Sequence, residues 1–235
     1  MIFALSGLLR AGVLAFLAGL LLTAVGIIAA ISVHEASHAW MANRLGDDTA
    51  KRLGRLSLNP LRHLDPMGTI MLLVAGFGWG KPVPVDIYRL GTNGTGGIAL
   101  VSLAGPLSNV IVAGGLGLLV RSGMLPWHPP GYAIPFAQKT LPWILSDVIG
   151  YVIAFNIILG VFNLLPIPPL DGFKIVIGIL PRSVAFSALR LEQYGSMALM
   201  VIVAFDIFFR TGILSSILGP GLSLAARVLV GRPFL

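Results

Sequence analysis

The chain has 235 residues, of which 56% are hydrophobic and only 11% are charged, and its mean hydropathy is +0.92. An average soluble domain carries about a quarter charged residues, so this composition indicates an integral membrane protein and excludes a separate soluble domain of ordinary size. The net charge of +7 does not indicate nucleic-acid binding, because the basic residues lie in loops between apolar runs, where membrane topology and anionic lipid explain them. The chain contains no cysteine, so any metal site must use His, Asp or Glu.

Four apolar segments are long enough to cross the hydrocarbon core as helices, which takes about 20 residues. They cover residues 11 to about 45, 97–120, 142–165 and 195 to about 218. The first is too long for a signal peptide and lacks a basic leader, so we expect it to be retained. A shorter apolar piece, residues 67–80, contains four glycines and is predicted to be re-entrant. The predicted fold class is an all-α integral membrane bundle, a single domain over residues 1–235.

The basic residues predict the orientation of this bundle. If the first helix runs from outside to inside, ten of the sixteen Lys and Arg residues fall at its inner end or in the inner loops. The positive-inside rule then puts residues 46–96 and 166–194 in the cytoplasm. We expect a multi-pass protein of the plasma membrane, with small β-strand or hairpin elements near its cytoplasmic face.

The end of the first predicted helix carries the sequence "HEASH", which comprises His34, Glu35 and His38. Because four residues make just over one helical turn, both imidazoles project from one face with Glu35 beside them, which is typical of zinc sites. The alternative is a pair of polar histidines at a helix end with a solvated glutamate. The 23 residues from Ala11 rise about 34 Å, which places His34 near the cytoplasmic edge of the bilayer.

A catalytic zinc site takes three protein ligands and leaves one position open, so two histidines are not enough. The other candidate ligands are Asp47, Asp48, His63, Asp65, Asp86, His128 and Asp171. We favour Asp171, in "NLLPIPPLDG" (163–172), because the predicted helix before it runs in the same direction and rises about 36 Å, to a similar depth. An ordinary Asp-Gly turn is the alternative interpretation of this residue.

Together, "HEASH" and "NLLPIPPLDG" resemble the site-2 protease family of intramembrane zinc metalloproteases, in particular its compact bacterial and archaeal members without a PDZ or CBS domain. The stretches "GRLSLNPLRHLDPMGT", "GWGKPVPVD" and "LAGPLSN" are also similar to this family, so the core motifs run from residue 29 to 174. The C-terminal helix and tail, residues 195–235, add little to the resemblance.

The resemblance implies one zinc ion per chain, bound by His34, His38 and Asp171, with Glu35 as the general base. It also implies that the substrates are transmembrane proteins, cut within or next to their spans in the lipid bilayer. Asn163 matches the asparagine of the family's pattern and would hold the substrate backbone or the oxyanion, although a helix-end cap is an equal alternative. No nucleic acid is expected, and a homo-oligomer is left open.

A transmembrane helix hides its peptide bonds, so a substrate must unwind before it is cut. Residues 81–89, "KPVPVDIYR", alternate Val with Pro and cannot be helical. We predict an edge strand in which Val83 and Val85 bind the unwound substrate, with a plain cytoplasmic linker as the alternative. Asn109 is interpreted as an interhelical hydrogen bonder. The alternative function is a non-proteolytic zinc-binding membrane scaffold; a transporter is disfavoured, since the four helices show no inverted repeat.

Overall fold

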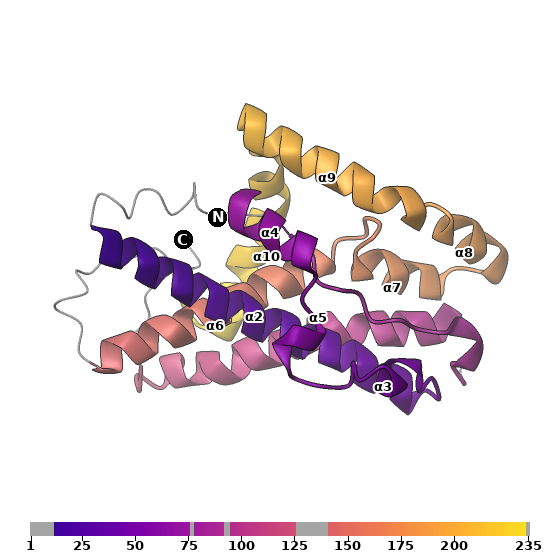
Figure 1. Cartoon of the computed structure of the whole chain (residues 1–235), viewed down its shortest axis with the longest axis horizontal. Coiled ribbons are helices and arrows are strands. Elements are labelled where there is room, and N and C mark those ends of the chain that lie inside the picture. Colours follow the sequence, from indigo (N-terminus) through magenta and orange to yellow (C-terminus); the bar gives the residue numbers. More distant parts are fainter. Residues whose placement is uncertain (1–11, 76–77, 92–94, 126–140, 234–235) are drawn as a thin grey trace.

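A computed structural model describes residues 12–75, 78–91, 95–125 and 141–233 of the chain (Figure 1). Its helices are α2 (Val13–Arg44), α3 (Thr49–Arg52), α4 (Pro66–Ala75), α5 (Thr95–Arg121), α6 (Leu141–Asn163), α7 (Asp171–Ile179), α8 (Arg182–Leu189), α9 (Glu192–Phe209) and α10 (Ile213–Leu229). Two short 3-10 turns, η2 (Pro60–Arg62) and η3 (Ile87–Arg89), lie in the loops between α3 and α5.

Four of these helices, α2, α5, α6 and α9, are long and apolar enough to cross a membrane. The predictions of an all-helical fold and of four helices that could cross a membrane are therefore confirmed. The fourth helix ends earlier than predicted, although the sequence stays apolar beyond it. Arg210 adopts the left-handed conformation with φ of 50°, and Asp206 Oδ1 accepts a hydrogen bond from the backbone N–H of Ile213, so the chain turns and begins α10.

The core of the bundle is formed by α2, α5 and α6, which pack against one another, and α7 lies on α5 (Figure 1). Small residues allow this close packing: a Cβ on Gly26 of α2 would lie only 2.8 Å from the backbone oxygen of Tyr151 in α6. An apolar cluster joins α5 and α6 to α10 around Ile153, Ile157 and Val230. These contacts fix the relative positions of α2 and α5, which matters for the polar groups described below.

The predicted β elements are wrong for the part of the chain that the structure describes. One isolated antiparallel bridge pairs Leu64 with Gly80, and residues 81–86 are extended but pair with no strand. The sequence explains this: Pro82 and Pro84 have no N–H to donate to a ladder. The turn η3 then replaces the last residues of the predicted strand.

The predicted re-entrant segment is not supported either. Residues 67–75 of this segment lie in α4, whose ten residues rise about 15 Å, roughly half of the hydrocarbon core, and residues 78–80 lie outside any helix. Met67 and Ile70 of this helix are exposed on the outside of the bundle. Residues 76–77 of the expected segment lie outside the described part of the chain.

The loop after α2 is held by a buried carboxylate, Asp47. Its two oxygens accept hydrogen bonds from the backbone N–H groups of Thr49, at 3.0 Å, and Asp86, at 2.7 Å. Burial raises the pKa of Asp47, but the hydrogen bonds from Thr49 and Asp86 outweigh it and hold the pKa below its usual value. Asp47 thus joins the end of α2 to the end of the extended segment.

Candidate metal centre

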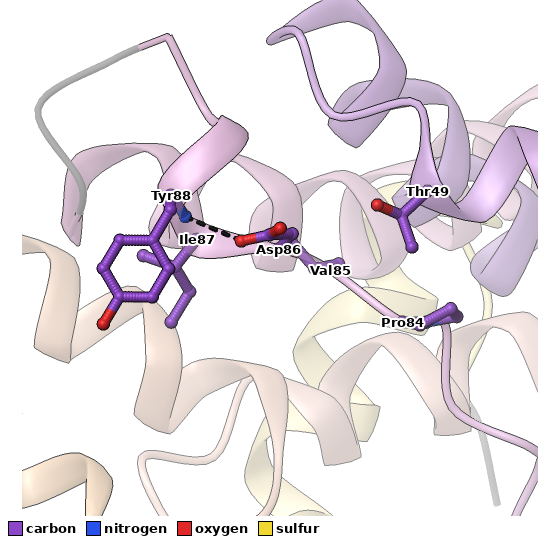
Figure 2. A pocket seen from close by; sticks show the side chains of 6 residues that line it. All are labelled: Thr49, Pro84, Val85, Asp86, Ile87 and Tyr88. Carbon is purple, nitrogen blue, oxygen red and sulfur yellow. Dashed lines mark hydrogen bonds between the residues drawn. The ribbon is translucent and has the colours of Figure 1, made fainter.

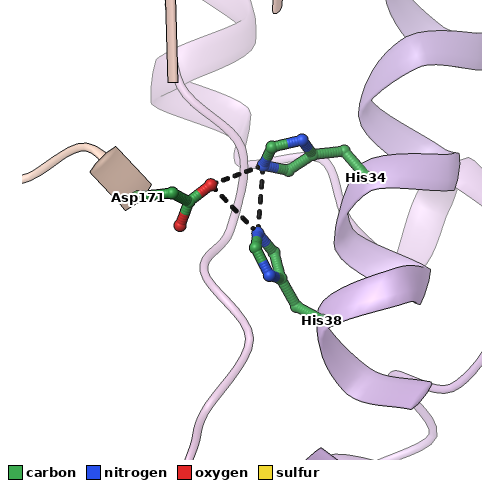
Figure 3. Close-up of side chains that lie close together, drawn as sticks. All are labelled: His34, His38 and Asp171. Carbon is green, nitrogen blue, oxygen red and sulfur yellow. Dashed lines mark hydrogen bonds and ion pairs between the residues drawn. The ribbon is translucent and has the colours of Figure 1, made fainter. Parts of the chain in front are cut away.

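Three side chains with metal-binding atoms meet inside the bundle: His34 and His38 of α2, and Asp171 at the start of α7 (Figure 3). The two Nε2 atoms lie 3.0 Å apart, and Asp171 Oδ2 lies 3.0 Å from His34 Nε2 and 3.2 Å from His38 Nε2. Both histidines are buried and the carboxylate is largely so. The structure therefore brings together the three residues that the sequence singled out as ligands.

A short loop between α6 and α7 brings Asp171 to the histidines. Pro166, Pro168 and Pro169 cannot continue a helix, and α7 begins at Asp171, where a carboxylate is favoured by the positive end of the helix. The next residue must be small, since a Cβ on Gly172 would lie 2.3 Å from the backbone oxygen of Leu164. The loop composition thus fixes the position of the carboxylate.

Hydrogen bonds to the outer ring nitrogens determine which nitrogen of each histidine is protonated. His34 Nδ1 lies 2.7 Å from Asn109 Oδ1, and His38 Nδ1 lies 2.7 Å from the backbone oxygen of Val101. A carbonyl oxygen can only accept, so both Nδ1 atoms donate their protons. Each Nε2 then carries a lone pair directed at the other ligands, the arrangement that outer hydrogen bonds impose on metal-binding histidines.

The amide of Asn109 is itself oriented by its neighbours. Its Nδ2 donates to the backbone oxygen of Ala30, at 3.1 Å, and to Asn156 Oδ1, at 2.8 Å. Asn156 in turn donates to Val152 O within α6. Both asparagines are completely buried, so this chain of hydrogen bonds connects α2, α5 and α6 behind His34.

The donor atoms fit a zinc ion. Asp171 Oδ2 is buried and receives no hydrogen bond from any described residue, because the facing Nε2 atoms are acceptors. Three converging acceptors repel one another unless a cation lies between them. Tetrahedral zinc with bonds of about 2.0 Å separates its ligand atoms by about 3.3 Å, close to the observed spacings. Two imidazoles and one carboxylate with a fourth position open are the ligand set of catalytic zinc sites.

A glycine in α5 makes room for both imidazoles. A Cβ on Gly105 would lie 2.4 Å from His38 Nε2 and 2.7 Å from His34 Cε1, far closer than atoms in contact. Gly105 therefore forms the floor on which the two rings rest. Its neighbour Pro106 lies inside the same helix and is also buried.

Glu35 lies on α2 beside the two histidines and is partly exposed. A Cβ on Gly80 would lie 3.7 Å from Glu35 Oε1, so the start of the extended segment passes next to this carboxylate. Glu35 forms no hydrogen bond or salt bridge with a described residue. Its carboxylate is therefore available to a water or a substrate at the centre.

The residues predicted to bind substrate are not members of this group of three side chains. Asn163 ends α6, and its Nδ2 donates to Leu159 O one turn back, at 3.1 Å, as expected of a helix-end residue. Val83 and Val85 lie in the extended segment, where Val85 packs against the cluster around Ala42. No hydrogen bond joins Asn163 to the three candidate ligands.

The remaining candidate ligands have structural roles elsewhere. His63 is completely buried, and its Nε2 lies 2.6 Å from the backbone oxygen of Ser57. Asp65 accepts from the backbone N–H of Gly68 at the start of α4. The other described candidates are Asp47, in the loop after α2; Asp48, paired with Arg52; and Asp86, which caps η3. His128 lies outside the described residues.

The contacts that Gly105, Asn156 and the backbone oxygen of Val101 make around the centre were not predicted from the sequence. Asn109 was interpreted as an interhelical hydrogen bonder, which is confirmed, but its contact with His34 was not foreseen. Asn156 could have been noticed, because it is a single polar residue in the apolar stretch "AFNIIL" of a predicted helix. Gly105 lies in the stretch "LAGPLSN", but no pattern distinguishes its role from that of the other glycines, of which the chain has 29 in all.

Comparisons with known proteins point to zinc metalloproteases. Residues 132–205 match the model of "Peptidase family M50". The chain is 42% identical over 179 residues to "Putative zinc metalloprotease YwhC" of Bacillus subtilis, covering 76% of this chain and 78% of that protein. It is 31% identical over 163 residues to the proteins named "Putative zinc metalloprotease Rip2" of Mycolicibacterium smegmatis and Mycobacterium tuberculosis, covering 68% of this chain and 58% of each relative. No solved structure matches it.

Proposed function

Since the chain belongs to peptidase family M50, a family of zinc metalloproteases, we propose that it hydrolyses peptide bonds within or next to the transmembrane segments of other proteins. One observation carries the proposal: the buried group of His34, His38 and Asp171 takes both of its histidines from α2, a helix long and apolar enough to span the bilayer. A protease centre at that place meets substrates that are themselves in the membrane.

Zinc is the cofactor, and when bound by His34, His38 and Asp171 it supplies a Lewis acid for the scissile carbonyl. Glu35 acts as the general base: it takes a proton from the attacking water and later delivers it to the leaving amine. Asn109 and the backbone oxygen of Val101 keep both imidazoles in the tautomer whose Nε2 is free to bind metal.

The extended segment, residues 81–86, binds the unwound substrate. The backbone N–H groups of Val83 and Val85 form no hydrogen bond with a described residue, so both are available to an added strand. The segment begins beside Glu35, at Gly80, and ends in an open hollow of about 350 Å³ (Figure 2). Tyr88 stands at one end of this hollow and Thr49 and Pro84 at the other, with Val85 and Asp86 between them. A substrate side chain next to the cut bond would enter it.

Asn163 contributes a further contact to the substrate. It lies eight residues before Asp171, at the point where α6 gives way to the loop that carries this carboxylate. Its amide would hold either the substrate backbone or the oxyanion, after its Nδ2 turns away from Leu159 O. This role rests on the match to the family's pattern and on its place in the loop.

The centre faces the cytoplasmic side of the plasma membrane. This orientation is supported by the basic residues beyond the end of α2, which the positive-inside rule places in the cytoplasm. His34 lies ten residues before the end of α2, about 15 Å along its axis, so water reaches the centre from the cytoplasm over a short distance. Residues 1–235 act as a single membrane-embedded catalytic domain.

The alternative function is a zinc-binding scaffold without protease activity. A substitution at Glu35 distinguishes it from the proposed protease. A scaffold needs the three ligands but no general base. We would reconstitute the wild type and Glu35→Gln with tagged single-span proteins, and measure cleavage and zinc content in both. The matched control is Glu192→Gln, because Glu192 is the other glutamate of the chain.

The proposal expects Glu35→Gln to retain zinc and to lose cleavage by at least about a hundredfold. Glu192→Gln should cleave at close to the wild-type rate. Removal of zinc with a chelator should stop cleavage, and restored zinc should return it. Equal cleavage by wild type and Glu35→Gln would refute the assignment of Glu35, and zinc binding without cleavage in the wild type would favour the scaffold.

The role of the extended segment has its own test. Val83→Pro removes one backbone N–H, whereas Val83→Ala keeps it and only shortens the side chain. If the substrate pairs with this segment, Val83→Pro should lose cleavage and keep its zinc, while Val83→Ala keeps most of both. Equal cleavage by the two variants would remove backbone pairing at Val83 from the mechanism.

A further inference from the structure

A loop outside the candidate spans exposes an unusual number of leucines. In residues 51–62, here called the leucine loop, Leu53 is 59% exposed, Leu58 67% and Leu61 79%, and Leu56 is also exposed. Large apolar side chains grouped in this way on a surface mark a site of interaction.

The leucine loop is also basic. It contains four Lys and Arg residues and no Asp or Glu. Arg52 is paired with Asp48, but Lys51 and Arg62 are also exposed next to the leucines, so the same surface offers apolar side chains and positive charge. This combination matches the boundary of an anionic leaflet, where phosphate groups meet acyl chains.

The remaining basic residue, Arg55, is buried and holds the loop in place. Its guanidinium donates to the backbone oxygens of Lys81 and Pro82. At the end of the loop, the backbone oxygen of His63 accepts from the N–H of Lys81, at 2.7 Å. The exposed leucines are therefore presented by a loop with a defined internal anchor.

The position of the loop along α2 indicates what covers it. The loop begins beyond Arg44, the end of α2, and returns to the level of Glu35, because His63 lies against Gly80 and Gly80 against Glu35. From Glu35 to Arg44, a separation of nine positions, α2 rises about 14 Å. In the same stretch Arg44 stacks on the exposed ring of Trp40, 5.3 Å from its centroid, a pair typical of the membrane interface.

We propose that the leucine loop inserts into the headgroup and upper acyl region of an anionic leaflet. Leu58 and Leu61 enter the apolar boundary, while Lys51 and Arg62 bind lipid phosphates above it. Exposing this many leucines to water is unfavourable. The positive charge of the same surface attracts anionic lipid.

Lipid contact at the leucine loop also affects the position of the segment that lies next to the metal centre. Arg55 and His63 connect the loop directly to Lys81, and Gly80 lies beside Glu35. Insertion of the loop thus holds the extended segment at a fixed depth next to Glu35. This consequence rests on the proposed protease function, whereas the lipid contact does not, so the test below reads lipid contact without any cleavage assay.

The absence of cysteine from the sequence makes the test direct. Leu58→Cys, Leu61→Cys and the control Ser187→Cys, at an exposed position in α8, each accept one environment-sensitive fluorophore. The labelled full chains are reconstituted in phosphatidylcholine vesicles with or without phosphatidylglycerol. Quenching is measured with a lipid that carries a nitroxide near the headgroup end of its acyl chain, and with iodide in the buffer. Wild-type zinc content shows that each variant is folded.

In the vesicles with phosphatidylglycerol, quenching by the nitroxide lipid should be at least about threefold stronger for the labels at positions 58 and 61 than for the label at 187. The labels at positions 58 and 61 should also be shielded from iodide. Omitting phosphatidylglycerol, or introducing Lys51→Gln with Arg62→Gln, should weaken the lipid quenching. Iodide access equal to that at 187 would overturn the proposal. Shielding from iodide without lipid quenching would also overturn it, and would assign the loop to a protein partner or a second copy. Equal quenching in neutral vesicles would overturn the assignment to anionic lipid.

Discussion

Adding a single methyl group at Gly105 should disable the metal centre without touching a candidate ligand. In Gly105→Ala the new Cβ would lie 2.4 Å from His38 Nε2 and 2.5 Å from His38 Cε1. Heavy atoms in contact are separated by about 3.5 Å, so the ring must move by about 1 Å. His38 Nδ1 is bonded to the backbone oxygen of Val101 on the same helix, at 2.7 Å, so the ring cannot move without breaking that bond.

A displacement of this size is large for a zinc site, whose bond lengths are defined to about 0.2 Å. Loss of an outer hydrogen bond alone typically costs about 10–100-fold in metal affinity, so Gly105→Ala should lose at least that much. The assay is competition for zinc against a chelator of known affinity, in detergent, with the protein's melting temperature measured in parallel. It requires no substrate.

Gly115→Ala is the matched control. It makes the same change in the same helix, where a Cβ would meet nothing within 4 Å, and alanine favours a helix over glycine. We expect its zinc affinity to equal that of the wild type. A zinc affinity of Gly105→Ala within about twofold of the Gly115→Ala value would refute the reasoning, because the rings would then not rest on Gly105.

Three further predictions follow from the contacts around the centre and the loop after α2. Asn109→Ala removes the acceptor for His34 Nδ1 and should weaken zinc binding about 10–100-fold in the same competition assay. Chelation of zinc should lower the melting temperature of the wild type, and added zinc should restore it, since bound metal stabilises the folded state. Asp47 has a folded pKa below its usual value of 3.8, so its stabilisation is complete above that pH and is lost as the pH falls through the folded pKa. The melting temperature of Asp47→Asn should therefore be lower at neutral pH and fall less steeply below about pH 4 than that of the wild type.

The sequence was sufficient to predict that His34, His38 and Asp171 lie close together, because the geometry of the individual helices constrains their positions. The spacing of His34 and His38 within one helix determines that they share a face. The equal lengths of the two helices that lead to His34 and Asp171 indicated a common depth, and these side chains do meet. Their roles as ligands, and that of Glu35 as base, stay predictions until metal binding and cleavage are measured.

The features that the sequence did not reveal depend on contacts between distant segments. Gly105 is 67 residues from His38, and its importance comes only from how closely α5 approaches α2. The expected strand at 81–89 does not form because prolines remove donors, and Arg55, 26 residues earlier, binds the carbonyl of Lys81. Hydrophobic patterning also failed to mark the end of α9, since the left-handed turn at Arg210 interrupts a sequence that remains apolar.

The most direct test of the central claim is to map, by mass spectrometry, the bond that the purified protein cuts in one reconstituted single-span substrate. The account predicts a new terminus within the span or immediately next to it, formed by the wild type and by Glu192→Gln but not by Glu35→Gln at equal zinc content. A terminus that lies only in a soluble domain of the substrate, or one that Glu35→Gln produces as fast as the wild type, would contradict it.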